Sequence, residues 1–319
     1  MRRILVLSSV LSISLALMGG AVASAEVPPC TGSYSQSTLY SDQGRLESVI
    51  VGNSGRLYFS GALPGASLEN EVSRLYKVDR PGATPSPILD GPAGPGGLAW
   101  SSKRLLWGYG NTLANGAAGD LTPKSGLFSV NPANGKRSIV SKTLGMANGI
   151  AHAKDGTIFA SNDLGFKLDR IVKKGSAFNT TNGFANLYSA NGLTISRNGK
   201  YLYAAQTFVT PSTISRIEIA DPASIITYYT SPEAANLIFD GLTRDNLGNL
   251  YVAVLSRGEV WKINGSKQAC VLATGLANPS NVAISNAKKG FKAGNLYAVE
   301  FGGKVTQVKG ATKAEVPAS

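Results

Sequence analysis

The sequence has little of several residue types and patterns, and each shortage excludes a class of protein. Two cysteines and one histidine in 319 residues leave no cluster with the spacing of a structural zinc site. No stretch after residue 25 is long and apolar enough to cross a bilayer. The 31 Lys and Arg residues outnumber the 19 Asp and Glu residues, but they are scattered in blocks of no more than two. We therefore expect no nucleic-acid partner.

The first 25 residues have the features of a secretory signal peptide. A basic start at Arg2 and Arg3 precedes an apolar run over residues 4–17, and residues 23–25 form a small-residue cleavage site. We therefore expect a protein that is secreted or periplasmic, without a transmembrane segment, and monomeric.

The two cysteines lie near opposite ends of the mature chain, at Cys30 and Cys270. Disulfide bonds persist in exported proteins. We predict that these cysteines pair and thereby close the two ends of the domain on each other. Two unpaired, buried thiols are the alternative.

A short pattern recurs six times along the chain. It consists of a polar residue, a glycine, an apolar stretch, a turn with glycine and a second apolar stretch. The copies begin at Glu47, Gly96, Asn148, Asn191, Asp240 and Asn281. Starts that lie between 41 and 52 residues apart are typical of the four-stranded blades of a propeller.

Each copy predicts a β-hairpin, because β-branched, aromatic and aliphatic residues alternate on both sides of a short turn. In four copies the turn glycine lies eight residues after the first position, at Gly55, Gly156, Gly199 and Gly248. A third short strand is expected over residues 74–78, 126–130, 214–218 and 259–263.

No segment of the mature chain has a sustained 3.6-residue apolar period, which argues against a helical core. We predict an all-β fold, a six-bladed β-propeller with four-stranded antiparallel blades over residues 26–310. Residues 30–39 precede the first hairpin and are expected to supply a closing outer strand. Residues 311–319 are expected to form a flexible tail.

The opening residues of the copies are the candidate site, because the first strand of each blade lines the central channel of a propeller. Glu47, Asn148, Asn191 and Asp240 combine carboxylate and amide oxygens, the ligand types that Ca²⁺ prefers. We therefore expect these four residues to bind a divalent cation, with Ca²⁺ as the ion. The alternative is that the Asn-Gly and Asp-Gly pairs are merely turns between blades.

The hairpin geometry adds further candidates at the same mouth. It places Asp163 opposite Asn148 and Gln206 opposite Asn191, so that Asp163 is a candidate catalytic or substrate-contact residue and Gln206 a candidate substrate contact. A solvated strand end is the alternative for Asp163. The single histidine, His152, lies four residues beyond Asn148, roughly 13 Å deeper along the strand. We therefore do not expect it to be catalytic.

These segments resemble the family of the senescence marker protein, gluconolactonase and luciferin-regenerating enzyme, over residues 40–308. The resemblance is carried by Glu47 in ESVIVGNSGRLYFSG, by Asn148-Gly149 and Asn191-Gly192, and by Asp240-Gly241-Leu242 ahead of Gly248. It implies a metal-dependent hydrolase of a lactone or related ester.

The same resemblance implies roles for individual residues. Glu47, Asn191 and Asp240 would be metal ligands, and Asn148 a substrate contact or fourth ligand. Asp240 ranks first as the base that takes a proton from water, and Asp163 second.

The chain departs from the family pattern after the glutamate, where Ser48, Val49 and Ile50 stand in place of the common Gly-Pro and Trp. Related propellers include paraoxonases and strictosidine synthase-like proteins, so esters and phosphotriesters stay open as substrates. A second function also stays open, an exported binding or scaffold propeller. In that case residues 85–97 and 111–125 would form a binding surface or a lid.

Overall fold

A computed structural model describes residues 26–65 and 72–318 of the chain. The predicted signal peptide over residues 1–25 lies outside the described residues. Within the described ranges, no helix has the length and apolar character needed to cross a membrane.

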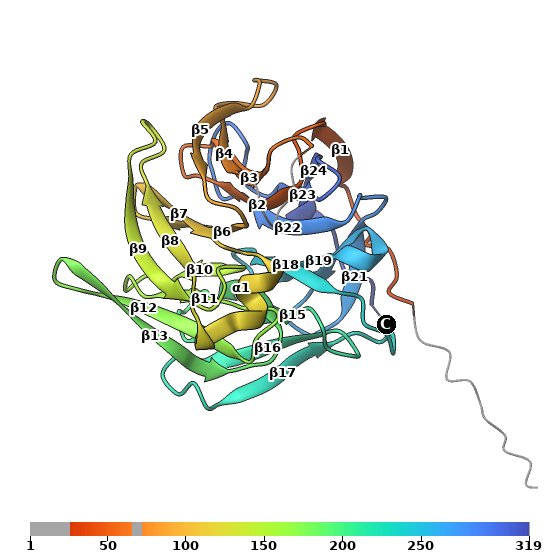
Figure 1. Cartoon of the computed structure of the whole chain (residues 1–319). Coiled ribbons are helices and arrows are strands. Elements are labelled where there is room, and N and C mark those ends of the chain that lie inside the picture. Colours follow the sequence, from red (N-terminus) through yellow and green to blue (C-terminus); the bar gives the residue numbers. More distant parts are fainter. Residues whose placement is uncertain (1–25, 66–71, 319) are drawn as a thin grey trace, which may run out of the picture.

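The strands form six four-stranded antiparallel sheets arranged in a ring (Figure 1), which confirms the predicted six-bladed β-propeller. From the channel outwards, blade 1 contains β2 (Leu46–Val51), β3 (Leu57–Ala62), β4 (Ser73–Val78) and β5 (Ser86–Gly91); blade 2 contains β6 (Pro95–Ser101), β7 (Arg104–Tyr109), β8 (Ser125–Val130) and β9 (Arg137–Leu144); blade 3 contains β10 (Ile150–His152), β11 (Ile158–Ala160), β12 (Lys167–Lys174) and β13 (Ala177–Asn186). Blade 4 contains β14 (Ala190–Ile195), β15 (Tyr201–Gln206), β16 (Thr213–Glu218) and β17 (Ile225–Thr230); blade 5 contains β18 (Phe239–Arg244), β19 (Leu250–Val254), β20 (Glu259–Ile263) and β21 (Ala269–Ala273); blade 6 contains β22 (Pro279–Ile284), β23 (Leu296–Glu300), β24 (Val305–Lys309) and β1 (Ser35–Tyr40).

The helical elements are short and lie in connections: α1 (Leu113–Ala118), η1 (Gly119–Leu121), η2 (Leu255–Arg257) and η3 (Ala311–Lys313). The α1 and η1 elements belong to the predicted insertion between β7 and β8. In Figure 1 the insertion lies at the front, near the middle of the ring.

The hairpin turns follow the sequence pattern. Gly55, Gly156, Gly199 and Gly248 have φ angles of 77°, 91°, 75° and 94°, a region that favours glycine. The expected third strands lie within β4, β8, β16 and β20. Residues 85–97 are not a loop, because they contain β5 and the start of β6. Proline is tolerated in β5 because this strand is outermost in its blade and its free edge needs no ladder hydrogen bond.

The first and last parts of the domain are joined in two ways. β1 pairs antiparallel with β24, with Ser35 opposite Lys309, and so supplies the predicted outer strand of blade 6. The predicted disulfide bond is also confirmed, because Cys30 is bonded to Cys270 of β21 across a sequence separation of 240 residues. The N-terminal segment therefore holds blades 5 and 6 together.

The expected flexible tail is wrong for residues 311–315. Ala311 and Ala314 are buried, and the backbones of Thr31 and Glu315 exchange two hydrogen bonds of 2.9 Å. The buried ammonium of Lys262 donates to the carbonyl oxygen of Ala314 at 2.6 Å. The segment stays packed because it caps the hydrophobic cluster around the disulfide bond.

The hydrophobic core lies between neighbouring blades. Trp261 and Phe239 of blade 5, for example, pack against Ile214 of blade 4, and the two aromatic rings meet edge to face at 5.7 Å. Burial of such side chains stabilises the fold by about 2–3 kcal/mol each. The inner strands are therefore held on a rigid frame, which fixes the side chains at their ends.

Candidate functional site

Three of the candidate ligands lie at irregularities of the inner strands. Glu47, Asn191 and Asp240 each fall at a register shift between the first and second strands of their blades. A bulge adds a residue to one strand and changes the direction of its side chain. The repeated bulge therefore explains how equivalent positions of different blades present polar groups at one mouth of the channel.

The glycine after each polar residue makes room for the next blade. A Cβ atom on Gly149 would lie 2.2 Å from the carbonyl oxygen of Asn191, and one on Gly192 would lie 2.4 Å from the carbonyl oxygen of Asp240. Neither glycine has a positive φ angle, so these pairs are not turns. The turn alternative is therefore wrong for them, and the glycines bring successive polar residues close together around the ring.

Three carboxyl groups influence one another at this mouth. Burial, followed by repulsion from Asp240 and Asp163, raises the pKa of Glu47 well above its usual range, although Arg45 opposes the shift. Burial and then repulsion from Asp163 raise the pKa of Asp240 well above its usual range. For Asp163 burial is the main cause, and its pKa is raised to about 6. The three side chains therefore share one electrostatic environment.

The predicted amides belong to the same group. A side-chain hydrogen bond from Asn148 to Asp163 and one from Asn191 to Asp240 each lower the pKa of the carboxyl group that accepts it. Nδ2 of Asn191 also donates to Oγ1 of Thr207 at 3.0 Å, which orients the amide. The structure thus brings all four predicted ligands and Asp163 to one end of the channel.

Asn111 is a member of the site that the repeat does not reveal. Its Nδ2 donates to Oε1 of Glu47 at 3.0 Å and to the carbonyl oxygen of Pro95 at 3.2 Å. Asn111 lies in the connection after β7, outside the repeated segment. Its only signal in the sequence is its place at the start of the insertion over residues 111–125.

The donor set fits a divalent cation. Oδ1 of Asn111 and Oδ1 of Asp163 are buried and have no hydrogen-bond partner among the described residues. Two neighbouring buried carboxylates, Glu47 and Asp240, repel each other unless they are protonated or bind a cation. Within residues 26–65 and 72–318, no three His, Cys, Asp or Glu side chains form a metal site by themselves. A cation here would therefore need the amide oxygens as well.

Gln206 does not behave as predicted. It pairs with Ala190 rather than Asn191, because the bulge shifts the register. Its Nδ-type amide nitrogen, Nε2, donates to the carbonyl oxygen of Tyr188 at 2.7 Å, and its Oε1 accepts from Ser215 at 2.7 Å. Both amide atoms are thus used within blade 4, and Gln206 is not retained as a substrate contact.

Two further polar residues of the inner hairpins lie outside the site. Glu300 accepts from the backbone of Ala277 at 2.6 Å and from Thr306 at 2.7 Å, which is a structural arrangement. His152 ends β10 at the deeper end, where burial lowers its pKa. This position agrees with the expectation that His152 is not catalytic.

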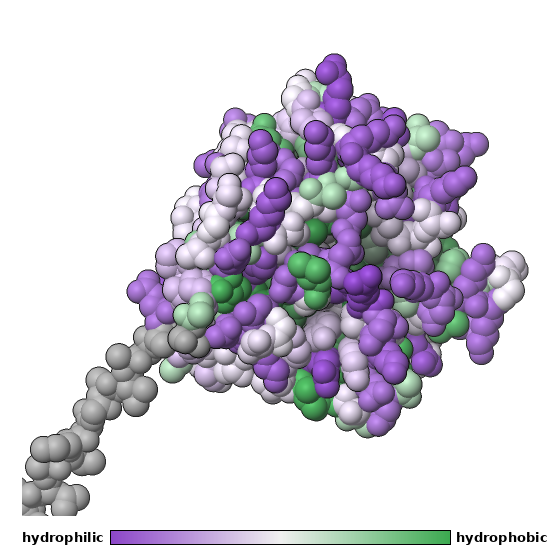
Figure 2. All heavy atoms as spheres, turned by 180° about the vertical axis from the view of Figure 1, so that it is seen from behind, coloured by the Kyte–Doolittle hydropathy of each residue, from purple (hydrophilic) through white to green (hydrophobic). Residues whose placement is uncertain are grey.

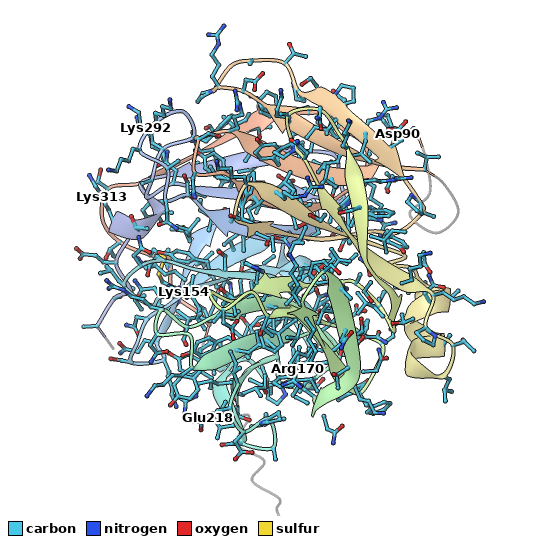
Figure 3. The ribbon with its side chains drawn as sticks, turned by 90° about the vertical axis from the view of Figure 1, so that its left-hand side faces the viewer. Asp90, Lys154, Arg170, Glu218, Lys292 and Lys313 are labelled. Atoms are coloured by element: carbon cyan, nitrogen blue, oxygen red, sulfur yellow. A yellow bond between two sulfur atoms is a disulfide. The ribbon has the colours of Figure 1, made fainter. Side chains whose placement is uncertain are left out.

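The channel behind the site contains a cavity of about 370 Å³, lined largely by inner-strand residues from Gly149 at the site end to Lys154 at the other. In the side view of Figure 3, Lys154 lies on the opposite side of the molecule from the α1 insertion. The two mouths of the channel are therefore chemically different.

No protein-family model and no curated protein matches this sequence. Among solved structures, a gluconolactonase from Xanthomonas campestris is similar, with a TM-score of 0.67, 19% identity and coverage of 89% of this chain and 95% of that one. The fold is shared with gluconolactonase. A luciferin-regenerating enzyme matches with a TM-score of 0.64 and 14% identity over 90% of this chain and 98% of its own.

A protein of another description has the same architecture. An auxiliary nutrient binding protein from Bacteroides ovatus matches with a TM-score of 0.65 and 10% identity, over 89% of this chain and 77% of that one. Identities of this size establish a common fold, which hosts more than one function. Function must therefore be argued from the site.

Proposed function

We propose that this chain is an exported, divalent-cation-dependent hydrolase of lactones or related esters, with Ca²⁺ as the ion. Glu47, Asn191 and Asp240 would hold the cation, and Asn148 would be a fourth ligand or a substrate contact. The observation that carries the proposal is the group of buried, mutually repelling carboxyl groups beside unpartnered amide and carboxylate oxygens at one channel mouth. Such a group is costly to bury without a cation.

When bound, the cation would polarise the substrate carbonyl group and lower the pKa of a water molecule. The chain itself must accept a proton as the water oxygen attacks the carbonyl carbon and the ester C–O bond breaks. The sequence ranks Asp240 first for this role, but the structure favours Asp163. Its pKa of about 6 suits proton transfer near neutral pH, and its Oδ1 is free of hydrogen bonds from the described residues.

The other residues would position these groups. Asn148 holds Asp163, and Asn111 holds Glu47. The proton taken by Asp163 would then pass to the departing alkoxide oxygen, which gives a hydroxy acid from a lactone. The rigid blades keep these partners in place without a large rearrangement.

The test combines Ca²⁺ titration, followed by thermal melting, with hydrolysis of lactones and aryl esters with and without chelator. We expect Ca²⁺ to raise Tm and chelator to abolish turnover. Asp240→Ala should lose the Tm shift and lower kcat/KM by about 100-fold or more, because it removes a ligand. Asp221→Ala, an exposed aspartate in the turn before β17, should behave as the wild type.

An unchanged Ca²⁺-induced shift in Asp240→Ala would reject Asp240 as a ligand. A clear shift without turnover of any lactone or ester would favour the second candidate, a binding protein, for which the shared fold with a nutrient binding protein is the supporting observation.

A further inference from the structure

Exposed apolar side chains gather around the site. Of the nine large hydrophobic side chains exposed in the described part of the chain, five lie in loops at the site end of blades 2, 3 and 4. We refer to these five as the apolar rim: Leu113, Leu121, Phe166, Tyr188 and Phe208. Leu121 is 91% exposed and Phe166 68% exposed, so these side chains pack against little of the protein itself.

The rim loops are connected to one another. Nδ2 of Asn162, beside Asp163, donates to the carbonyl oxygen of Gly116 in α1 at 3.0 Å. The rings of Phe166 and Tyr188 lie 5.0 Å apart. The backbone nitrogen of Phe208 donates to Oγ of Ser189 at 2.8 Å, next to Tyr188. The five residues therefore belong to one continuous set of loops.

Each rim loop also carries a residue of the candidate site. Asn111 precedes Leu113 by two positions and binds Glu47. Asp163 precedes Phe166 by three positions. Thr207, which accepts from Asn191 at 3.0 Å, directly precedes Phe208. A ligand that reaches the carboxyl groups must therefore pass beside the rim.

The opposite face has a different character. Figure 2 shows it from behind, covered mainly by hydrophilic side chains. In Figure 3, Lys154, Lys292 and Lys313 lie on that side, away from α1. The concentration of apolar side chains at the site end is thus a property of this mouth and not of the whole surface.

We propose that the apolar rim binds an aliphatic or aromatic group of the substrate, so that the enzyme acts on apolar lactones or esters rather than on polyhydroxylated sugar lactones. This inference rests on the proposed hydrolase function. A sugar lactone needs a hydrogen-bond partner for each buried hydroxyl group, whereas the rim presents carbon surface. Binding energy from a non-reacting alkyl or aryl group would raise kcat/KM.

The test compares two six-membered lactones, δ-decalactone with an alkyl chain and glucono-δ-lactone with hydroxyl groups. We expect the wild type to prefer δ-decalactone by about tenfold or more in kcat/KM. The double variant Leu121→Ser, Phe166→Ser should lose about 10-fold to 100-fold on δ-decalactone and little on glucono-δ-lactone. Both positions are exposed, so folding should be unaffected.

Leu247→Ser is the matched control, because Leu247 is 81% exposed and lies in the turn between β18 and β19, away from the site. It should leave both activities unchanged. Equal or better hydrolysis of glucono-δ-lactone, or an equal loss on both lactones in the rim variant, would overturn the inference while the hydrolase function stands.

Binding of the fluorescent apolar probe N-phenyl-1-naphthylamine provides a readout that does not depend on turnover. We expect saturable binding to the wild type, displaced by δ-decalactone and weakened in the rim variant. If neither lactone is hydrolysed but this binding holds, the hydrolase function fails and the apolar ligand class stands.

Phosphatidylcholine vesicles test the rim as a membrane contact. If the rim variant loses vesicle binding while its preference between the two lactones is unchanged, the rim is a membrane surface and the inference is wrong.

Discussion

The carboxyl groups of the site make the metal-free protein sensitive to pH. Asp163 has a folded-state pKa of about 6, above the model value of 3.8, and the pKa values of Glu47 and Asp240 are also raised. A group with a raised pKa binds more protons in the folded than in the unfolded state. Its stabilising contribution is therefore present below pH 4 and is lost as the pH rises through the folded-state pKa.

We expect the Tm of the chelated wild type to fall, through this contribution, as the pH rises from about 4 to about 7. Asp163→Asn cannot titrate at this position and should show a smaller fall. Melting curves of the two proteins in chelator, across this pH range, make the comparison. Parallel curves would show that Asp163 does not titrate with a raised pKa.

At the level of single residues, the sequence predicts the members of the site better than their tasks. Glu47, Asn148, Asn191 and Asp240 could be found because the same position recurs in successive blades. Asn111 could not, because its contact with Glu47 depends on the path of the insertion, which has no counterpart in the other repeats. The position of Gln206 was misjudged because a bulge changes the register of its hairpin.

Neighbouring inner elements are joined by buried hydrogen bonds directly beneath the site. Oγ of Ser161, just after β11, accepts from the backbone nitrogen of Gly149 at 2.7 Å and donates to the carbonyl oxygen of Asn191 at 2.6 Å. One hydroxyl group therefore connects blade 3 to blade 4 at the two Asn-Gly pairs.

Ser161→Ala should lower the free energy of unfolding by about 1–3 kcal/mol, because it leaves buried backbone groups without partners. It should also weaken Ca²⁺ binding, since the two Asn-Gly pairs lose their common support. Urea unfolding and Ca²⁺ titration measure the two effects. Ser138→Ala, at an exposed position of β9, is the control, and equal behaviour of the two variants would contradict this role.

At the level of elements, the alternation of apolar residues and the spacing of turn glycines identify the hairpins, because both follow from local backbone geometry. Residues 85–97 escaped this reading. Their glycine and proline content is typical of a loop, yet the outer strand β5 tolerates it, since one of its edges is free. The short helix α1 was also missed, because six residues are too few to show a helical period.

For the molecule as a whole, the disulfide bond between Cys30 and Cys270 closes a loop of 240 residues. We expect the double variant Cys30→Ser, Cys270→Ser to have a free energy of unfolding lower by about 2–5 kcal/mol, mainly because its unfolded chain is less constrained. Urea unfolding measures the loss. Thiol counting on the unfolded, unreduced wild type should find none, and an unchanged urea midpoint in the variant would contradict the expected stabilisation.

The ring of blades and the disulfide pairing could be predicted at this scale, because the number of repeats and the positions of the cysteines determine them. The docking of residues 311–315 could not. Their composition is typical of a chain end, and their burial depends on the surface formed by Cys30, Cys270 and Lys262. That surface exists only after the ring has closed.

The pairing of β1 with β24 also has a consequence for the order of assembly. A ribosome delivers β1 first and β24 last, so blade 6 has to wait until almost all of the domain has been synthesised. Until then β1 is an unpaired strand, exposed to other chains and to proteases. Late closure is therefore the step at which we expect newly made chains to depend most on chaperones.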